Sequence, residues 1–154
     1  MFTFYDIQHL IMLSQLKLLQ PIIADGYKIF TSEYRLSYYS GPKQFQVKNL
    51  IEAGQVQLVD QPEDLASFIE EFTEPFSYAG KGVLMLMNLC KSTKSILIIE
   101  EDEQLIIDVA AYFGVATISI IEFYKQKIKD SRYHEFLINI HKSKQRSGSV
   151  EGSI

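Results

Sequence analysis

The chain has 154 residues and a formal net charge of −4, and 47% of its residues are apolar. This length and apolar content predict one domain with a substantial core. The sequence has no apolar run of the roughly 18 residues that a membrane-spanning helix needs, and no basic stretch before an apolar segment at its start, so neither a membrane span nor a signal peptide is expected. Cys90 is the only cysteine, which excludes an internal disulfide and a cysteine-based zinc site and favours a cytoplasmic location.

Charge is divided unevenly along the chain. Residues 1–124 hold 16 acidic against 8 basic residues, whereas residues 125–154 hold 3 acidic against 7 basic residues. A basic segment can lie against the phosphates of a nucleic acid, and such binding weakens as the salt concentration rises. The alternative is a solvated helix face followed by a flexible end. Both interpretations stay open at this point.

The first half of the chain alternates short apolar runs with helical patterns. The short runs are expected to be strands because they are apolar and bounded by turn residues; they are Phe2–Tyr5, Tyr27–Phe30 and Val56–Val59. Helical spacing, caps and breaking residues predict the helices between them. These helices are one from Ile7 to Pro21, one capped by Ser32, one that follows the Ser40-Gly41-Pro42 break and ends at Gly54, and one that begins near Pro62.

The alternation is clearer in the second half. It predicts a buried helix over Val83–Cys90, a strand over Ile96–Ile99, a helix from Leu105 to Phe113, a strand over Val115–Ser119 and helical patterning from Ile121 to Ile140. Alternating strands and helices are typical of an α/β sandwich with a mainly parallel sheet. We therefore expect an α/β domain over residues 1–124, a C-terminal helical extension over 125–143, and a disordered basic tail with Gly and Ser over 144–154.

Acidic side chains gather at the ends of two of these predicted strands. Glu100-Glu101-Asp102-Glu103 follows directly on the apolar run Ile96–Ile99, and Asp6 follows the first strand. In open parallel sheets, ligands gather in the crevice outside the carboxyl ends of the strands. Carboxylates that converge there without basic partners are most simply explained by a divalent metal ion.

Five features occur along the chain in an order that can be compared with known families. They are Asp6-Ile7-Gln8-His9-Leu10-Ile11, Glu33 on the helix after the second strand, Ile51-Glu52-Ala53-Gly54-Gln55-Val56, Ile98-Ile99-Glu100-Glu101-Asp102-Glu103-Gln104-Leu105, and Phe113-Gly114-Val115-Ala116. Together they resemble a PIN domain over roughly residues 2–124. PIN domains are metal-dependent ribonucleases and include toxins of bacterial toxin–antitoxin pairs. The resemblance implies a three-layer α/β/α sandwich with a mainly parallel central sheet, RNA as the substrate, and a protein inhibitor as a further partner.

The resemblance also implies a set of site residues. Asp6 matches the first aspartate of the family, Glu33 its helix glutamate, and Glu101 with Asp102 the acidic pair after the later strand. By this match Asp6, Glu101 and Asp102 would hold Mg²⁺ or Mn²⁺, and Glu33 would position a metal-bound water or bind a second ion. These four acids are the catalytic residues that we expect for hydrolysis of RNA phosphodiester bonds.

One departure from the family supports an alternative function. The family usually has an acid shortly after a serine at the start of the long apolar helix, where this chain has Gly80 followed by Lys81. The alternative is therefore a degenerate PIN-like module that binds a nucleic acid or a protein without cutting. A third possibility is a structural homodimer whose C-terminal helix, Ile121–His141, forms the interface.

Each candidate residue also has an ordinary structural interpretation. Asp6 is a preferred helix cap, and the acids from Glu100 to Glu103 suit the first turn of a helix. The tyrosines at helical spacing either stack on bases of a single strand or belong to the core or an interface; they are Tyr34, Tyr38 and Tyr39. The histidines show no local metal motif, and we expect His9 to serve packing; the other two are His134 and His141.

Overall fold

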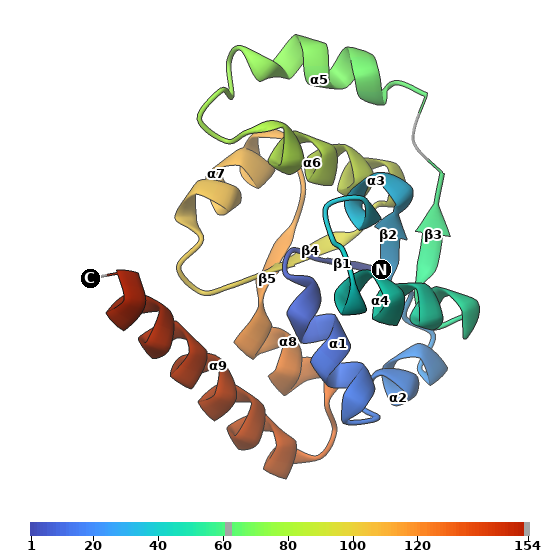
Figure 1. Cartoon of the computed structure of the whole chain (residues 1–154), viewed down its shortest axis with the longest axis vertical. Coiled ribbons are helices and arrows are strands. Elements are labelled where there is room, and N and C mark those ends of the chain that lie inside the picture. Colours follow the sequence, from blue (N-terminus) through green and yellow to red (C-terminus); the bar gives the residue numbers. More distant parts are fainter. Residues whose placement is uncertain (61–62, 153–154) are drawn as a thin grey trace.

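Five parallel strands form the centre of the protein, which is described here from a computed structural model that covers residues 1–60 and 63–152 (Figure 1). β1 (Phe2–Phe4), β4 (Ile96–Ile99) and β5 (Thr117–Ser119) pair in the order β1-β4-β5, and β2 (Phe30–Ser32) pairs with β3 (Gln57–Val59). A parallel bridge between Phe2 and Ile29 joins the two groups. The order across the described strands is therefore β3-β2-β1-β4-β5, and the expected α/β class with parallel strands is confirmed.

This strand order creates a switch point between β1 and β4. After β1 the chain adds β2 and β3 on one side of β1, and it later adds β4 and β5 on the other side. The register pairs Phe4 with Ile98, so β1 and β4 end at the same edge of the sheet. In open α/β sheets, the crevice outside the strand ends at such a switch point is where ligands bind.

The helices begin where the sequence places capping residues. Asp6, Ser32 and Ser119 each accept a hydrogen bond from a backbone N–H two or three residues later, which satisfies a donor that the helix leaves free. The described helices are α1 (Ile7–Gln15), α2 (Leu19–Ala24), α3 (Glu33–Leu36), α4 (Pro42–Glu52), α5 (Leu65–Thr73), α6 (Lys81–Thr93), α7 (Gln104–Tyr112), α8 (Ile120–Lys127) and α9 (Ser131–Gly152).

Two of the expected helices differ in extent from those observed. The helix predicted from Ile7 to Pro21 is divided, because Lys17 has a left-handed backbone with φ of 59°. Pro21 lies in the first turn of α2, where a proline removes no helical hydrogen bond. The helix capped by Ser32 is a single turn, and the predicted start of the next helix at Pro62 lies outside the described residues.

The hydrophobic core lies on both faces of β4. Ile98 packs in a cluster with residues of β1, α1 and α8, whereas Leu97 and Ile99 pack in a second cluster with residues of α6 and α7. This alternation follows from the pleat of a strand, in which successive side chains point to opposite faces. The second cluster contains Cys90, which is buried as expected for an inert core thiol.

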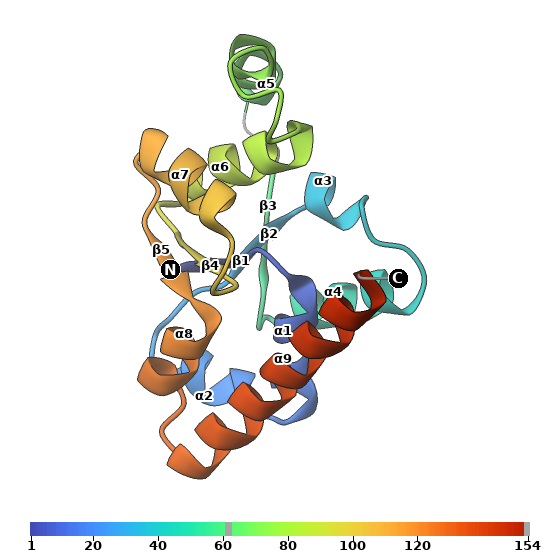
Figure 2. The same ribbon diagram turned by 90° about the vertical axis from the view of Figure 1, so that its left-hand side faces the viewer.

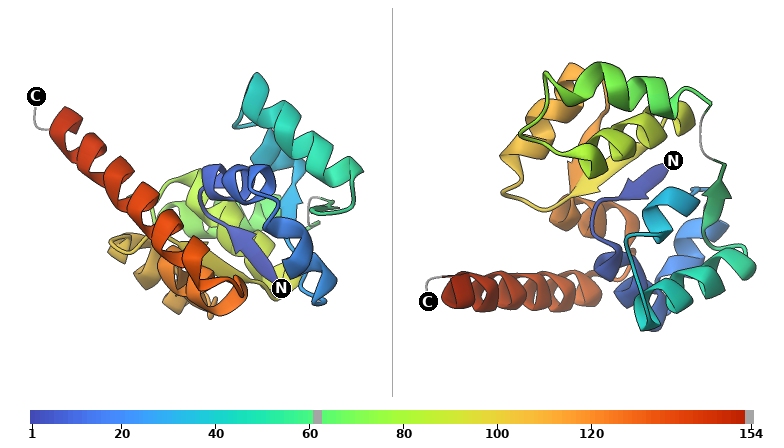
Figure 3. Two further views of the ribbon diagram at one scale, coloured as in Figure 1. Left: turned by 90° about the horizontal axis from the view of Figure 1, so that it is seen from below. Right: turned by 45° about the horizontal axis from the view of Figure 1, so that its top comes forward.

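The C-terminal helix α9 packs against α8 by its first turns and runs past α1 (Figure 2), and its far end projects from the rest of the protein (Figure 3). Leu137 and His141 of α9 are buried. α9 covers the residues of the expected helical extension and continues to Gly152. The expected division into a domain, an extension and a tail stays a prediction. Residues 153–154 lie outside the described residues. Within the described parts of the chain, no helix has both the length and the apolar character needed to cross a membrane.

Candidate functional site

A pocket of about 460 Å³ opens at the switch point of the sheet. Its polar lining comes from the end of β1, the end of β4, and the α3 region: Tyr5, Asp6, Arg35, Tyr38, Glu100 and Glu103. Leu86 of α6 lines its apolar side. The crevice that the sequence analysis predicted outside the strand ends is therefore present, and three carboxylates line it.

Asp6 lines this pocket and also caps α1. Its Oδ1 atom accepts a hydrogen bond of 2.8 Å from the backbone N–H of Gln8. The capping interpretation of Asp6 is therefore confirmed. Because only one carboxylate oxygen makes this bond, the cap and a role in the pocket are compatible.

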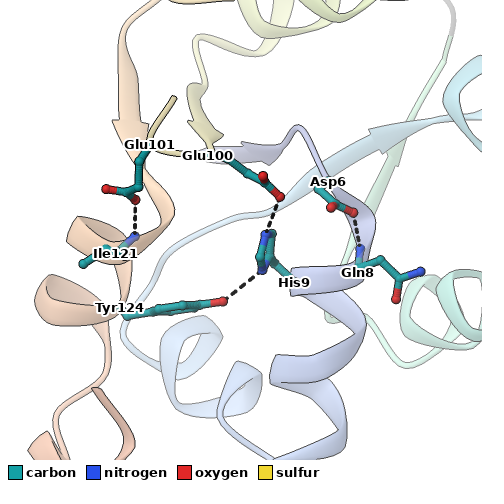
Figure 4. Close-up of polar contacts among 7 residues, drawn as sticks. All are labelled: Asp6, Gln8, His9, Glu100, Glu101, Ile121 and Tyr124. Atoms are coloured by element: carbon teal, nitrogen blue, oxygen red, sulfur yellow. Dashed lines mark hydrogen bonds and ion pairs between the residues drawn. The ribbon is translucent and has the colours of Figure 1, made fainter. Parts of the chain in front are cut away.

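Glu100 and Glu101 point away from each other, as Figure 4 shows. Glu100 points toward α1, where its Oε1 atom lies 3.3 Å from Nε2 of His9. Glu101 points toward α8 and accepts a hydrogen bond of 3.2 Å from the backbone N–H of Ile121. Of these two residues, only Glu100 lines the pocket.

The four acids expected from the resemblance do not share one pocket. Of these four, only Asp6 lines the pocket at the switch point. Glu33 lines a different pocket, beside Leu36 and Ser37 of the α3 segment, and Asp102 is exposed. Glu100 and Glu103 accompany Asp6 in place of Glu101 and Asp102.

Arg35 is a pocket residue that the sequence analysis missed. One terminal nitrogen of its guanidinium donates hydrogen bonds to two backbone carbonyls at the end of β1, those of Phe4 at 3.0 Å and Tyr5 at 2.9 Å. These bonds hold the backbone immediately before Asp6. Nothing in the local sequence distinguishes Arg35 from a solvated helix residue.

The electrostatic environment of the pocket is predominantly negative. The pKa of Glu103 is raised by burial and then by the charges of Glu100 and Asp102. The pKa of Tyr5 is raised by burial and then by Glu103, while the charge of Arg35 opposes this rise. The acids of the pocket thus repel one another, and a bound cation would relieve that repulsion.

The start of α6 contributes no carboxylate to the pocket. Gly80 is the N-cap of α6 with φ of 81°, a conformation that favours glycine, and it is Gly82 that lines the pocket. A Cβ atom added at Gly82 would meet no atom within 4 Å. At the start of α6 it is thus position 82, and not position 80, that borders the pocket.

A second cluster lies on the other side of Glu100. His9 is buried in α1, and its Nδ1 atom lies 3.1 Å from the hydroxyl of Tyr124 in α8. Burial lowers the pKa of His9, while the charges of Asp6 and Glu100 oppose that change. The ring of His141, from α9, lies 5.4 Å from the ring of His9.

His9, Glu100 and His141 form a group in which the potential metal-binding atoms all lie within 4.8 Å of one another. Over residues 1–60 and 63–152, it is the only such group of three or more His, Cys, Asp or Glu residues. From the sequence, His9 was expected to serve packing and the histidines showed no local metal motif. The three residues of the cluster come from distant parts of the chain, so no local spacing indicates it.

Comparison with models of known protein families gave no match to this chain. Comparison with curated proteins gave none either.

Proposed function

We propose that the protein is a PIN-like ribonuclease that depends on a divalent metal ion, with its active site in the pocket at the switch point and with the three-layer α/β/α arrangement of that family. The observation that supports this proposal is the position of Asp6, Glu100 and Glu103. These carboxylates follow two neighbouring parallel strands and line one pocket. They replace the set expected from the sequence, in which Asp6 was joined by Glu33, Glu101 and Asp102.

The donor atoms of the pocket suit Mg²⁺ or Mn²⁺, which prefer oxygen ligands and retain several waters. Asp6 has one oxygen outside its capping bond, and Glu100 has one oxygen outside its contact with His9. Burial, and then repulsion from Glu100 and Asp102, raises the pKa of the Glu103 carboxyl group. Asp6, Glu100 and Glu103 would hold the ion once their side chains turn toward one another, because in the described residues only His9, Glu100 and His141 have three potential ligand atoms within 4.8 Å of one another. A divalent ion in such a site lowers the pKa of water and neutralises charge on a phosphoryl group.

Other residues of the chain would position the substrate and the acids. Arg35 fixes the carbonyls of Phe4 and Tyr5 and so holds Asp6 at the pocket. Tyr38 lines the pocket with a side chain that is 60% exposed, which leaves its ring free to stack on a base of single-stranded RNA. Stacking of this kind tolerates any base, so we expect little sequence preference from Tyr38.

A second candidate function has its own support. Gly82 stands where α6 meets the pocket, and three of the acids expected from the family do not line it; they are Glu33, Glu101 and Asp102. These absences favour a module that binds RNA or a protein without cutting. The two functions differ in one measurable property, which is the appearance of shortened RNA.

The test is a cleavage assay on end-labelled single-stranded RNA with the full chain, in Mn²⁺ or in excess chelator. We expect cleavage in Mn²⁺ alone, and a loss of at least about tenfold in rate for Glu103→Gln, as is typical when groups that support a metal ion are changed. Asp108→Asn is the matched control, because Asp108 is an exposed acid of α7 that bonds Gln104. Gly82→Asp is expected to raise the rate, because the position has room for a carboxylate.

The outcomes separate the two functions. RNA binding without shortened products, in the wild type and in Gly82→Asp, would support the binding module. An equal loss of cleavage in Glu103→Gln and Asp108→Asn would remove the pocket as the active site. A loss in Glu33→Gln but not in Glu103→Gln would favour the acids expected from the resemblance.

A further inference from the structure

We propose that His9, Glu100 and His141 bind one Zn²⁺ ion, which ties α9 to α1 and to the end of β4. This site is separate from the proposed nuclease pocket, although Glu100 borders both. The inference does not depend on any activity toward RNA. It uses nitrogen donors that the pocket lacks.

The distances within the cluster are close to those of a zinc site. Zinc bonds to His nitrogen and carboxylate oxygen of about 2.0–2.1 Å place neighbouring ligand atoms of a tetrahedral site roughly 3.3 Å apart. The separation of His9 Nε2 and Glu100 Oε1 is 3.3 Å. All three potential ligand atoms, including one of His141, lie within 4.8 Å of one another.

His141 shows the second sign of a ligand. Its side chain is 2% exposed, and its Nε2 atom finds no hydrogen-bond partner within the described part of the chain. A buried polar atom without a partner is unfavourable, and such groups in proteins usually have a functional explanation. Coordination of a metal ion at this cluster would explain why the His141 ring nitrogen is buried without a hydrogen-bond partner.

Tyr124 provides the support that metal-binding histidines usually have. Such a histidine donates the N–H of its other ring nitrogen to a nearby acceptor, which fixes the tautomer. If Nδ1–H of His9 donates to the Tyr124 hydroxyl at 3.1 Å, the lone pair of Nε2 faces the Glu100 carboxylate. Two acceptor atoms 3.3 Å apart then require a cation between them. Without a metal ion, His9 takes the other tautomer, and its Nε2–H donates an ordinary hydrogen bond to Glu100. The experiment must therefore distinguish this hydrogen bond from a zinc site.

The donor set selects the kind of ion. Two imidazoles and one carboxylate are a known ligand set for Zn²⁺ and leave a fourth position open. Mg²⁺ and Ca²⁺ prefer sites made wholly of oxygen. The cluster is therefore expected to prefer Zn²⁺ or Co²⁺ over Mg²⁺, whereas the carboxylate pocket has the opposite preference.

The test uses the full chain, freed of metal with a chelator and titrated with Zn²⁺ by calorimetry. We expect one equivalent of Zn²⁺ to bind, and at least about tenfold weaker binding in His141→Gln. His134→Gln is the matched control, because His134 lies on the same helix and contacts the carbonyl of Ile128, away from the cluster. Zn²⁺ should raise the melting temperature of the wild type and of His134→Gln, and leave that of His141→Gln unchanged, because an ion that binds only the folded state stabilises it.

Visible absorption of bound Co²⁺ tests the site in the wild-type protein, so this measurement does not require any variant to fold. We expect the wild type to give the intense visible absorption of tetrahedral Co²⁺, and Zn²⁺ to abolish it by displacement. Absence of this absorption, or Zn²⁺ binding that His141→Gln and His134→Gln weaken equally, would overturn the site. No RNA enters these measurements, so a failure of the nuclease proposal would leave them unaffected.

Discussion

The hydroxyl oxygen of Tyr124 lies 3.1 Å from Nδ1 of His9, although 115 residues of chain separate them. Both side chains are buried, so this contact joins α8 to α1 without competition from water. Burial raises the pKa of Tyr124, followed by the charges of Asp6 and Glu100, so its hydroxyl keeps its proton at neutral pH. The same contact orients the His9 ring toward Glu100.

Removing that hydroxyl should destabilise the fold. We expect Tyr124→Phe to lower the free energy of unfolding by about 1–3 kcal/mol, because it leaves a buried ring nitrogen without its partner. The measurement is urea unfolding of the metal-free protein. Tyr112→Phe is the control, since Tyr112 is 65% exposed, and it should change stability by less than about 0.5 kcal/mol. Equal stabilities of the two variants would show that the Tyr124 contact contributes nothing.

Arg35 should matter more to stability than an exposed arginine with comparable hydrogen bonds. Arg35→Met removes two bonds from a charged donor to the carbonyls of Phe4 and Tyr5, and we expect a loss of about 1.5–3 kcal/mol in the free energy of unfolding. The control is Arg132→Met, which removes a surface ion pair with Asp130 and should have no measurable effect. If Arg35→Met left the free energy of unfolding unchanged, the hydrogen bonds of Arg35 would not be needed to stabilise the end of β1.

Cys90 should make stability fall at alkaline pH. Burial raises the pKa of its thiol to about 12, and this effect exceeds those of the Arg35 charge and the Thr3 hydroxyl, which favour the thiolate. The unfolded thiol titrates near pH 8.5. Between these two values the unfolded chain releases a proton that the folded protein keeps, so the stability present below the unfolded pKa is lost as the pH rises.

The change is measured as a difference from Cys90→Ala, because that comparison cancels the titration of other groups. From pH 8 to pH 10 we expect the wild type to lose about 1–2 kcal/mol more than the variant in urea unfolding. A parallel decline in both proteins would show that the buried thiol has an ordinary pKa.

The sequence predicted those parts of the fold that depend on local pattern. Apolar runs of strand length identified Ile96–Ile99, and the capping preference of Ser32 identified the start of α3. The crevice at the strand ends followed from the parallel sheet, which placed Asp6 correctly at its edge.

The positions of the remaining site residues depend on tertiary contacts, which the sequence pattern does not reveal. Glu100 and Glu101 both follow the end of β4, and only their contacts with His9 of α1 and Ile121 of α8 decide that Glu100 lines the pocket. His141 joins the cluster only because α9 crosses α1 at one particular angle, which the packing of Leu137 and its neighbours sets. Arg35 acts through backbone carbonyls, which have no sequence signature.

Glu100 presents one oxygen to His9 and lines the carboxylate pocket as well. An ion bound by the histidines and Glu100 would reduce the negative charge that Glu100 offers to an ion in the pocket. An ion in the pocket would likewise reduce the charge that Glu100 offers to an ion at the histidines. By thermodynamic linkage, the factor by which either ion changes the affinity of the other must be the same in both directions. The two proposed sites would then form a single coupled system, in which the supply of a soft metal sets the sensitivity of the protein to a hard one.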